Sequence, residues 1–346
     1  MKQNPTHSRQ VWILDEGSQG HLVQSRGLIR ELSKVFPLSV TEVPIQCALP
    51  RRISRSLVKR LLRRVRHGWM FRLLHPGMKL PEGTPDLIVS SGPLSLAALE
   101  FLAKHHKAQS VFVQGTIAVP PGAVTVVMRP FEGEPREDYI FIPLLFTEIT
   151  PQAVEEAGND FIAQSAIHPR GPLNTLFIGN SSAKIRFTRG DWEGIARFVN
   201  DLWKRDGNQW LVSTSYRTGG ALEELFRRNV EPGAMLDAVW YSTAPRKVTK
   251  PFLGLADRIF VTMDSLTMLT EAVASGRQVF ALCPEDMNSD LSNTHLRYVH
   301  MLAEKGLVTL IQPGRDAVPP PGPHINPQVD YSDAIRQLLA KLDWKT

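Results

Sequence analysis

The sequence contains few cysteines and no long hydrophobic run. Two cysteines, Cys47 and Cys283, occur in 346 residues. They are too few for a disulfide framework and are not spaced like metal ligands, so we expect two buried or half-buried thiols in a reducing compartment. No apolar stretch reaches the roughly 18 residues of a membrane-spanning helix, and the polar N-terminus does not resemble a signal peptide. These absences predict a cytoplasmic protein.

The motifs of several common reaction centres are also missing. The sequence has no compact cluster with metal-ligand spacing, no Gly-x-Ser-x-Gly nucleophile motif and no Walker phosphate-binding loop. Pro284, Glu285 and Asp286 follow a predicted strand, but they form a weak metal site and are expected to line a cleft instead. We therefore expect neither a metal nor any other cofactor.

Positive charge is concentrated near the N-terminus. The net charge is +6, yet residues 1–78 hold 14 Lys and Arg against 4 Asp and Glu, which leaves the remainder negative. The segment from Arg51 to Arg72 contains nine of these basic residues and no acidic one. Within it, apolar residues recur every four positions from Ile53 to Val65. This spacing predicts a basic amphipathic helix.

Three roles fit such a helix. It can lie on an anionic membrane surface, or bind the phosphates of a nucleic acid. It can also pack its apolar face on the domain core and leave the basic face in solvent. No base-reading element accompanies it, so a nucleic-acid partner is not expected. The other two roles stay open, and membrane docking is the interpretation we favour.

The hydrophobic pattern predicts strands and helices that alternate in two successive blocks. In the first block the strands are short apolar runs, at residues 11–14, 38–45, 86–89, 110–113, 124–127 and 139–142. The pattern restarts after residues 168–172, which are rich in Pro and Gly. The strands of the second block lie at residues 173–178, 210–213, 238–241, 258–262 and 278–282. The length also fits two domains of about 100–200 residues each.

This order predicts two Rossmann-like α/β domains that face each other across a cleft. The first covers residues 1–167 and the second residues 168–330. A final amphipathic helix within residues 331–346 is expected to return to the first domain. A proline-rich stretch at residues 318–327 should run extended over the surface before it.

Ligands of open α/β sheets bind at the carboxyl ends of strands, and the strongest candidate loop lies at residues 262–271. A strand ends at Thr262, and Asp264 or Ser265 then caps a helix whose first N–H groups can hold a phosphate. Glu271 lies about two turns further along and can accept both hydroxyls of a ribose. The same residues are equally consistent with an ordinary capped helix and a solvated glutamate.

Two further loops of the second domain offer groups for a diphosphate. Residues 179–184 supply a glycine, hydroxyls and a basic side chain, and residues 214–218 supply hydroxyls and an arginine. Each loop is also compatible with an ordinary polar turn. The predicted donor-binding residues are Gly179, Ser181, Ser182, Lys184, Thr214, Ser215, Arg217, Asp264, Ser265, Met268 and Glu271.

The loop at residues 15–21 holds the candidate catalytic groups of the first domain. Asp15, Glu16 and His21 are side chains that can take a proton from an acceptor hydroxyl. A histidine in this position is more often structural than catalytic, and the two carboxylates are comparable candidates. The residue pattern therefore leaves the three as alternatives.

Four stretches together resemble the mitochondrial fission ELM-like family, whose bacterial members are regarded as GT-B-type glycosyltransferases. The stretches are LDEGSQGHLVQSRGL, FIGNSSAKIRF, LVSTSYRT and LADRIFVTMDSLTMLTEAVASG, spread over residues 14–276. The resemblance implies a nucleotide sugar in the second domain, with Ser265 at the diphosphate and Glu271 at the ribose. Through the likeness to the acceptor loop of the lipid II-forming transferase, it also favours His21 as the base. It further implies activity without a metal and membrane docking through the basic segment.

The sequence thus predicts a metal-independent glycosyltransferase at the inner face of the cytoplasmic membrane. It would move a sugar from a nucleotide-sugar donor to a membrane-associated acceptor, either lipopolysaccharide or another lipid-linked molecule. Two alternatives remain: a nucleotide-sugar epimerase or hydrolase on the same fold, and a membrane-surface interaction protein without turnover. The basic segment disfavours the epimerase or hydrolase, and the intact donor loop favours the transferase over the interaction protein.

Overall fold

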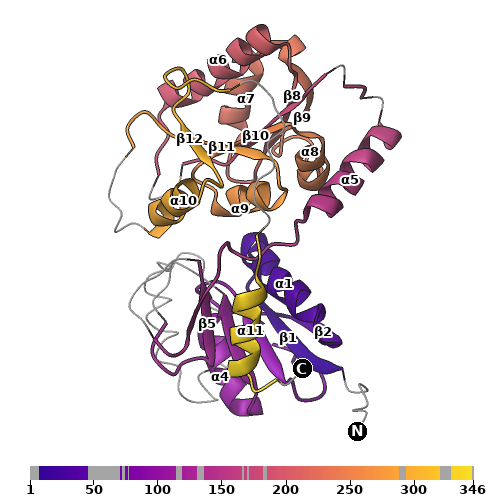
Figure 1. Cartoon of the computed structure of the whole chain (residues 1–346), viewed down its shortest axis with the longest axis vertical. Coiled ribbons are helices and arrows are strands. Elements are labelled where there is room, and N and C mark those ends of the chain that lie inside the picture. Colours follow the sequence, from indigo (N-terminus) through magenta and orange to yellow (C-terminus); the bar gives the residue numbers. More distant parts are fainter. Residues whose placement is uncertain are drawn as a thin grey trace. The chain divides into compact units, whose positions relative to one another are not determined.

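The chain forms two compact units, each built on a parallel sheet (Figure 1). The first unit comprises Met1–Glu148 and Val329–Thr346, and the second Ile149–Gln328. The computed structural model describes residues 8–45, 71, 75–76, 78–113, 119–130, 136–165, 167–169, 171–181, 185–287, 294–319 and 329–344. Cys47, Ser182, Lys184 and the basic segment apart from Phe71 lie outside the described residues.

The first unit contains a parallel sheet in the order β2-β1-β3-β4-β5-β6. Its strands are β1 (Arg9–Asp15), β2 (Leu38–Pro44), β3 (Leu87–Ser90), β4 (Gln109–Val113), β5 (Val126–Arg129) and β6 (Tyr139–Phe141). Its described helices are α1 (Gln19–Ser33), α4 (Leu96–His106) and α11 (Ser332–Lys341). Every side chain of β3 is buried, as expected for a parallel strand that is covered on both faces.

The second unit repeats this architecture in the order β12-β11-β10-β7-β8-β9. Its strands are β7 (Asn174–Ile178), β8 (Trp210–Thr214), β9 (Met235–Val239), β10 (Arg258–Thr262), β11 (Gln278–Leu282) and β12 (Thr309–Ile311). Its described helices are α5 (Pro151–Gln164), α6 (Arg189–Asp206), α7 (Gly220–Asn229), η1 (Pro232–Ala234), α8 (Thr249–Leu255), α9 (Leu266–Ala274) and α10 (Thr294–Glu304). Side chains along β7, β8 and β10 are buried throughout.

The predicted α/β class is confirmed, and most predicted strands lie close to the observed ones. β9 is an exception, because it begins three residues earlier than predicted and pairs with β8 through a register shift at Trp210/Leu211. The hydrophobic pattern also fails to predict α5. The fully buried residues of this helix are Val154 and Gly158, and Phe161 meets Phe252 edge-on. Val154, Ala157 and Phe161 do have helical spacing, but this apolar stripe is short and has a glycine at its centre.

The second unit begins at Ile149, earlier than the boundary predicted at residue 167, because α5 packs along α8 of that unit. Two glycines permit this packing. A Cβ atom on Gly254 would overlap the carbonyl oxygen of Val154, and one on Gly158 would lie 3.2 Å from the carbonyl carbon of Gly254. The helix backbones therefore touch where only glycine fits.

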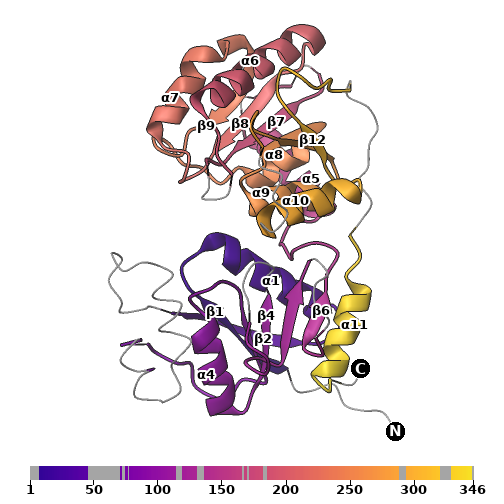
Figure 2. The ribbon, with the colours of Figure 1, turned by 90° about the vertical axis from the view of Figure 1, so that its left-hand side faces the viewer.

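The C-terminal helix belongs to the first unit, as predicted. Figure 2 shows α11 beside β6, which it contacts. Just before the helix, the Tyr331 hydroxyl donates to the carbonyl oxygen of Leu145 at 3.0 Å, and its ring stacks on Phe146 with centroids 4.7 Å apart. These contacts hold the start of α11 against the first unit, whose sheet contains β1.

The start of the proline-rich stretch is held by a buried arginine. Arg258 is fully buried, and its guanidinium donates to Asp206 at 2.7 Å and to the carbonyl oxygen of Pro319 at 2.8 Å. Arg205 donates to the preceding carbonyl, that of Val318, at 3.1 Å. Hydrogen bonds from Arg205 and Arg258 keep the pKa of Asp206 below its usual value although burial opposes them. Residues 320–328, the greater part of the stretch, lie outside the described residues.

Two local predictions have different outcomes. Cys283 is buried as predicted, and burial raises the pKa of its thiol to about 12, so the thiol stays protonated at neutral pH. Asp191, in contrast, is not the N-cap of α6. Thr188 occupies that position, and Asp191 completes a capping box by accepting the Thr188 backbone N–H at 2.6 Å. The helix begins earlier than predicted because the two residues satisfy each other's backbone donors.

Within the described part of the chain, no helix is long and apolar enough to cross a bilayer.

Replacing Gly254 by alanine should destabilise the second unit, because the added methyl group would push α5 away from α8. Overpacking of this kind costs about 1–3 kcal/mol, which urea denaturation followed by circular dichroism would measure. Gly194→Ala is the matched control: an added Cβ there would lie 3.9 Å from the Arg197 side chain, and alanine inside a helix should be neutral or stabilising. If Gly254→Ala were as stable as the wild type, the close packing of α5 and α8 would be contradicted.

Candidate functional site

Each sheet has one point at which the order of its strands reverses. In the first unit the chain passes from β1 to β2 on one side and returns to β3 on the other. In the second unit, β8 and β9 extend from one side of β7, and β10 to β12 from the other. Loops that follow the two central strands of such a sheet leave in opposite directions, and ligands bind between them. The β1/β3 and β7/β10 loops are therefore the places to examine.

In the second unit, one buried carboxylate joins the loops that follow three strands. Asp264 comes directly after β10 and its side chain is fully buried. It accepts the backbone N–H of Asn180, after β7, at 3.0 Å and the hydroxyl of Thr262 at 2.7 Å. It also pairs with Arg217, after β8, at 3.1 Å. Burial raises the pKa of Asp264 although these partners favour its charged form.

The loop after β7 must begin with glycine because the Asp264 carboxylate lies against it. A Cβ atom on Gly179 would lie 2.5 Å from a carboxylate oxygen of Asp264. The Asn180 side chain then donates to the carbonyl oxygens of Arg217 and Thr218 at 2.6 and 3.3 Å. In return, the Thr218 hydroxyl donates to the carbonyl oxygen of Gly179 at 2.6 Å. The loops after β7 and β8 are thus fixed to each other as well as to Asp264.

The start of α9 offers a place for an anion. Ser265, rather than Asp264, is the N-cap, and its side chain makes no capping hydrogen bond. The first backbone N–H groups of a helix have no partner within the helix and carry partial positive charge. His295 shares a hydrogen bond with the carbonyl oxygen of Met263 at 2.9 Å, just before this turn. Met268 and Glu271 follow on α9, and both are half-buried.

Several predicted donor-binding residues shape the loops. The Thr214 hydroxyl donates to Glu223 at 2.7 Å and accepts the backbone N–H of Tyr241 at 2.8 Å. The hydroxyl of Ser181 accepts the backbone N–H of Phe187 at 2.8 Å. Ser215 makes its own turn, since its backbone N–H donates to the hydroxyl of Thr218. These hydroxyl and backbone groups are engaged within the second unit, while Arg217 is about one-third exposed.

Sequence reasoning missed residues on either side of these loops. Asn180 and Thr218 lie in the two loops that the sequence indicated, at residues 179–184 and 214–218, but neither was among the predicted donor-binding residues. Tyr216 and Tyr241 are 75% and 47% exposed, with ring centroids 6.4 Å apart. Tyr241 was assigned to a strand over residues 238–241, whereas β9 ends at Val239 and leaves Tyr241 in the following loop. The misplaced strand therefore hid an aromatic pair at the carboxyl ends of β8 and β9.

In the first unit, a second buried carboxylate joins the loops after β1 and β3. The Glu16 side chain is 5% exposed, and its Oε2 atom accepts the backbone N–H groups of Leu94 and Ser95 at 2.8 and 2.9 Å, at the start of α4. Its Oε1 atom lies 2.6 Å from Nδ1 of His21. Glu16 therefore holds both the helix start and the imidazole.

Gly92 makes room for this pair. Its φ of +106° is in the left-handed region, and a Cβ atom there would overlap both Nδ1 of His21 and Oε1 of Glu16. The His21 side chain is 26% exposed. Because Glu16 holds Nδ1, the Nε2 atom is the ring nitrogen that can exchange a proton with another molecule. Asp15 has a different role, since its carboxylate accepts the backbone N–H of Gly17 at 2.8 Å and shapes the turn.

The described residues contain no group of three or more His, Cys, Asp and Glu side chains placed to hold a metal ion. Glu285, from the Pro-Glu-Asp stretch, pairs with Arg315 at the surface of the second unit at 2.5 Å.

Two parallel sheets of this topology, each with polar loops at its switch point, define an α/β protein of the GT-B type. The sequence model of the mitochondrial fission ELM1 family matches residues 19–337, so the chain belongs to this family. A comparison with curated proteins gave no match.

Solved structures that resemble the chain include epimerases and glycosyltransferases. The UDP-GlcNAc 2-epimerase from Neisseria meningitidis, bound to UDP-GlcNAc, is 10% identical with a TM-score of 0.52, over 88% of each chain. The epimerase from Methanocaldococcus jannaschii is 13% identical with a TM-score of 0.51, over 97% of this chain and 100% of that one. CalG4, the calicheamicin glycosyltransferase, is 13% identical with a TM-score of 0.50, over 98% and 94%. At these identities the likeness establishes the fold alone.

Replacing Asp264 by alanine should destabilise the second unit by on the order of 1–3 kcal/mol, because buried donors lose their acceptor. Asp264→Asn should be milder, because it keeps one acceptor oxygen. The pKa of Asp264 is raised in the folded chain, so folding favours the protonated form of this side chain. The resulting stabilisation is complete below the pKa of Asp264 in the unfolded chain, and it is lost as the pH rises through the pKa in the folded chain.

Asp264→Asn should lose this part of the pH dependence, because an amide does not ionise. Urea denaturation at a series of pH values measures both effects. If Asp264→Ala were as stable as the wild type at every pH, the proposed role of this carboxylate as the junction of three loops would be wrong.

Proposed function

We propose that this chain is a metal-independent glycosyltransferase that moves a sugar from a nucleotide-sugar donor to a membrane-associated acceptor. The observation that carries the proposal is the Glu16–His21 pair at the switch point of the first sheet. Removing a proton from an acceptor hydroxyl requires a base whose orientation is fixed by a further group. Glu16 fixes one ring nitrogen of His21 and leaves the other to act as that base.

The loops of the second unit supply the groups that a nucleotide-sugar donor needs. The first turn of α9 can receive the diphosphate at its N–H groups, and Arg217 adds positive charge nearby. Glu271, about two turns along α9, is proposed to accept the ribose hydroxyls. Tyr216 and Tyr241 offer an exposed aromatic face for the nucleobase. The epimerase from M. jannaschii, of the same fold, was solved with UDP-GlcNAc and UDP.

The acceptor is proposed to lie at the inner face of the cytoplasmic membrane, as lipopolysaccharide or another lipid-linked molecule. This part of the proposal rests on the basic segment from Arg51 to Arg72 and on the family to which the chain belongs. At the end of the segment, Phe71 is buried and stacks on Phe101 of α4 with centroids 4.3 Å apart. Phe71 itself therefore packs in the unit that contains His21.

His21→Ala should lower turnover by roughly two to four orders of magnitude without weakening donor binding. The assay incubates the full chain with a panel of nucleotide sugars and glycolipid acceptors, and it measures release of the nucleoside diphosphate. His168→Ala, at an exposed histidine of the second unit, is the matched control and should have wild-type turnover. Unchanged turnover of His21→Ala would show that His21 is not the base. Formation of an isomeric nucleotide sugar, or release that needs no acceptor, would replace the transferase by an epimerase or hydrolase.

Calorimetric titration with the same donors tests the second half of the proposal separately. Glu271→Ala should bind the donor about tenfold more weakly than the wild type, whereas the exposed Glu304→Ala should bind it equally well. If the wild type binds no donor, or Glu271→Ala binds as tightly as the wild type, the donor site is misplaced.

Charge reversal at Arg60, Arg63 and Arg64 should abolish sedimentation of the chain with phosphatidylglycerol vesicles. The wild type should sediment with these vesicles and not with neutral phosphatidylcholine vesicles, and added salt should weaken the association because it screens the charges. Charge reversal at Arg227, Arg246 and Arg315, three arginines of the second unit that do not line its pocket, is the matched control. Equal sedimentation of the wild type and the first variant would contradict docking through the basic segment.

A further inference from the structure

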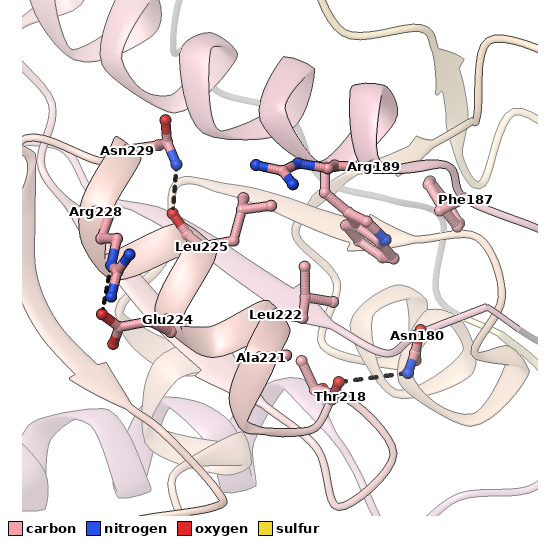
Figure 3. Close-up of a pocket in the computed structure, with 11 residues that line it drawn as sticks. Asn180, Phe187, Arg189, Thr218, Ala221, Leu222, Glu224, Leu225, Arg228 and Asn229 are labelled. Carbon is pink, nitrogen blue, oxygen red and sulfur yellow. Dashed lines mark hydrogen bonds and ion pairs between the residues drawn. The ribbon is translucent and has the colours of Figure 1, made fainter.

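A pocket of about 550 Å³ lies between α6 and α7 of the second unit. Figure 3 shows Leu222 and Leu225 projecting from α7 toward the space below α6, with Arg189 above it. The volume falls within the range of about 300–1,000 Å³ that is usual for small-molecule sites. Neither Ser265 nor Glu271 of the proposed donor site lines this pocket, although Asn180 and Thr218 of the neighbouring loops do.

The interior of the pocket is apolar. Phe187 and Trp192 stack on each other with centroids 4.6 Å apart, and both rings are more than nine-tenths buried. The leucines of α7 complete this surface. Three uncharged polar side chains also line the pocket, and their donors are engaged. The Asn180 amide donates to two carbonyls, the Thr218 hydroxyl to the carbonyl of Gly179, and the Asn229 amide to the carbonyl of Leu225. The interior therefore favours a hydrocarbon group over a polar one.

The edge of the pocket is polar and carries more positive than negative charge. Arg189 and Arg228 contribute two guanidinium groups to the lining, and Glu224 contributes one carboxylate. Each arginine pairs with a glutamate one turn away on its own helix, yet the two arginine side chains are 85% and 75% exposed. Exposed pairs of this kind are weak. Both guanidinium groups can therefore turn to an anion, which they bind well when it presents two or more oxygens.

We propose that this pocket binds an anionic amphiphile with a single hydrocarbon chain. The chain lies against Trp192, Leu222 and Leu225, and the phosphate or carboxylate headgroup meets Arg189 and Arg228. This combination follows from an apolar interior with engaged polar groups and an edge with exposed guanidinium groups. The site goes beyond the glycosyltransferase activity and does not depend on it, because the residues proposed to hold the amphiphile lie on α6 and α7 and none of them is assigned to the donor or to the base. Asn180 and Thr218 of the proposed donor loops also line the pocket, but they are given no contact with the amphiphile.

Dodecyl phosphate, titrated into the full chain below its critical micelle concentration, is the probe for this site. Calorimetry should show saturable one-to-one binding by the wild type. Inorganic phosphate alone should not bind, and dodecyl maltoside, which has the same chain and an uncharged headgroup, should bind about tenfold more weakly or worse. Each of these results reports on one half of the pocket.

Two variants locate the binding. Leu225→Glu places a carboxylate in the apolar interior, and the double variant Arg189→Ala, Arg228→Ala removes the headgroup partners. Each should weaken dodecyl phosphate binding about tenfold or more. Arg227→Ala is the matched control on α7, because Arg227 does not line the pocket and lies over the ring of Trp240. Circular dichroism checks that the variants are folded. If Leu225→Glu does not fold, the double arginine variant still tests the proposal, because it leaves the apolar interior unchanged.

The proposal is overturned if the wild type does not bind dodecyl phosphate below its micelle concentration. It is equally overturned if the double arginine variant binds as tightly as the wild type, or if dodecyl maltoside binds as well as the phosphate. Because the titration contains no nucleotide sugar, its outcome is independent of whether the chain transfers sugars.

Discussion

The buried carboxylate of Asp264 is the interaction on which the second unit's candidate site depends. Three loops meet at it, through the backbone of Asn180, the hydroxyl of Thr262 and the guanidinium of Arg217. A carboxylate without exposure to water is costly unless its oxygens are matched by donors, so these loops have little freedom to separate. The start of α9 is consequently held in one place before any ligand arrives, which is the condition for an efficient anion site.

The first unit uses the same construction at its own switch point. Glu16 is also a buried carboxylate, and it joins the loop after β1 to the start of α4. In both units a glycine lies against the carboxylate, Gly179 beside Asp264 and Gly92 beside Glu16. The difference lies in the last partner. Asp264 binds an arginine, which is a permanent cation, whereas Glu16 binds His21, an imidazole that can accept or donate a proton.

The sequence alone predicted the α/β class and the loops that carry the candidate site. Buried parallel strands are continuous apolar runs, and polar residues directly after them identify the carboxyl edge of a sheet. Which way each side chain turns was not predictable, since Asp264 and Ser265 are both good helix caps and only the fold places Asp264 beside Gly179. The position of α5 depends on contact between Gly158 and Gly254, a backbone contact that the helical spacing of Val154, Ala157 and Phe161 does not reveal. The sequence did not show that Glu16, rather than Asp15, orients His21, because this role depends on contacts between Glu16 and the loop after β3.

The central claim is that the loops around Asp264 bind the donor, and hydrogen–deuterium exchange tests it most directly. The full chain would be exchanged with and without each nucleotide sugar of a panel, and the exchange followed by mass spectrometry. We predict that at least one donor slows exchange at residues 179–181, 215–218 and 264–268. Slower exchange confined to other parts of the chain, or no change with any donor, would contradict the claim.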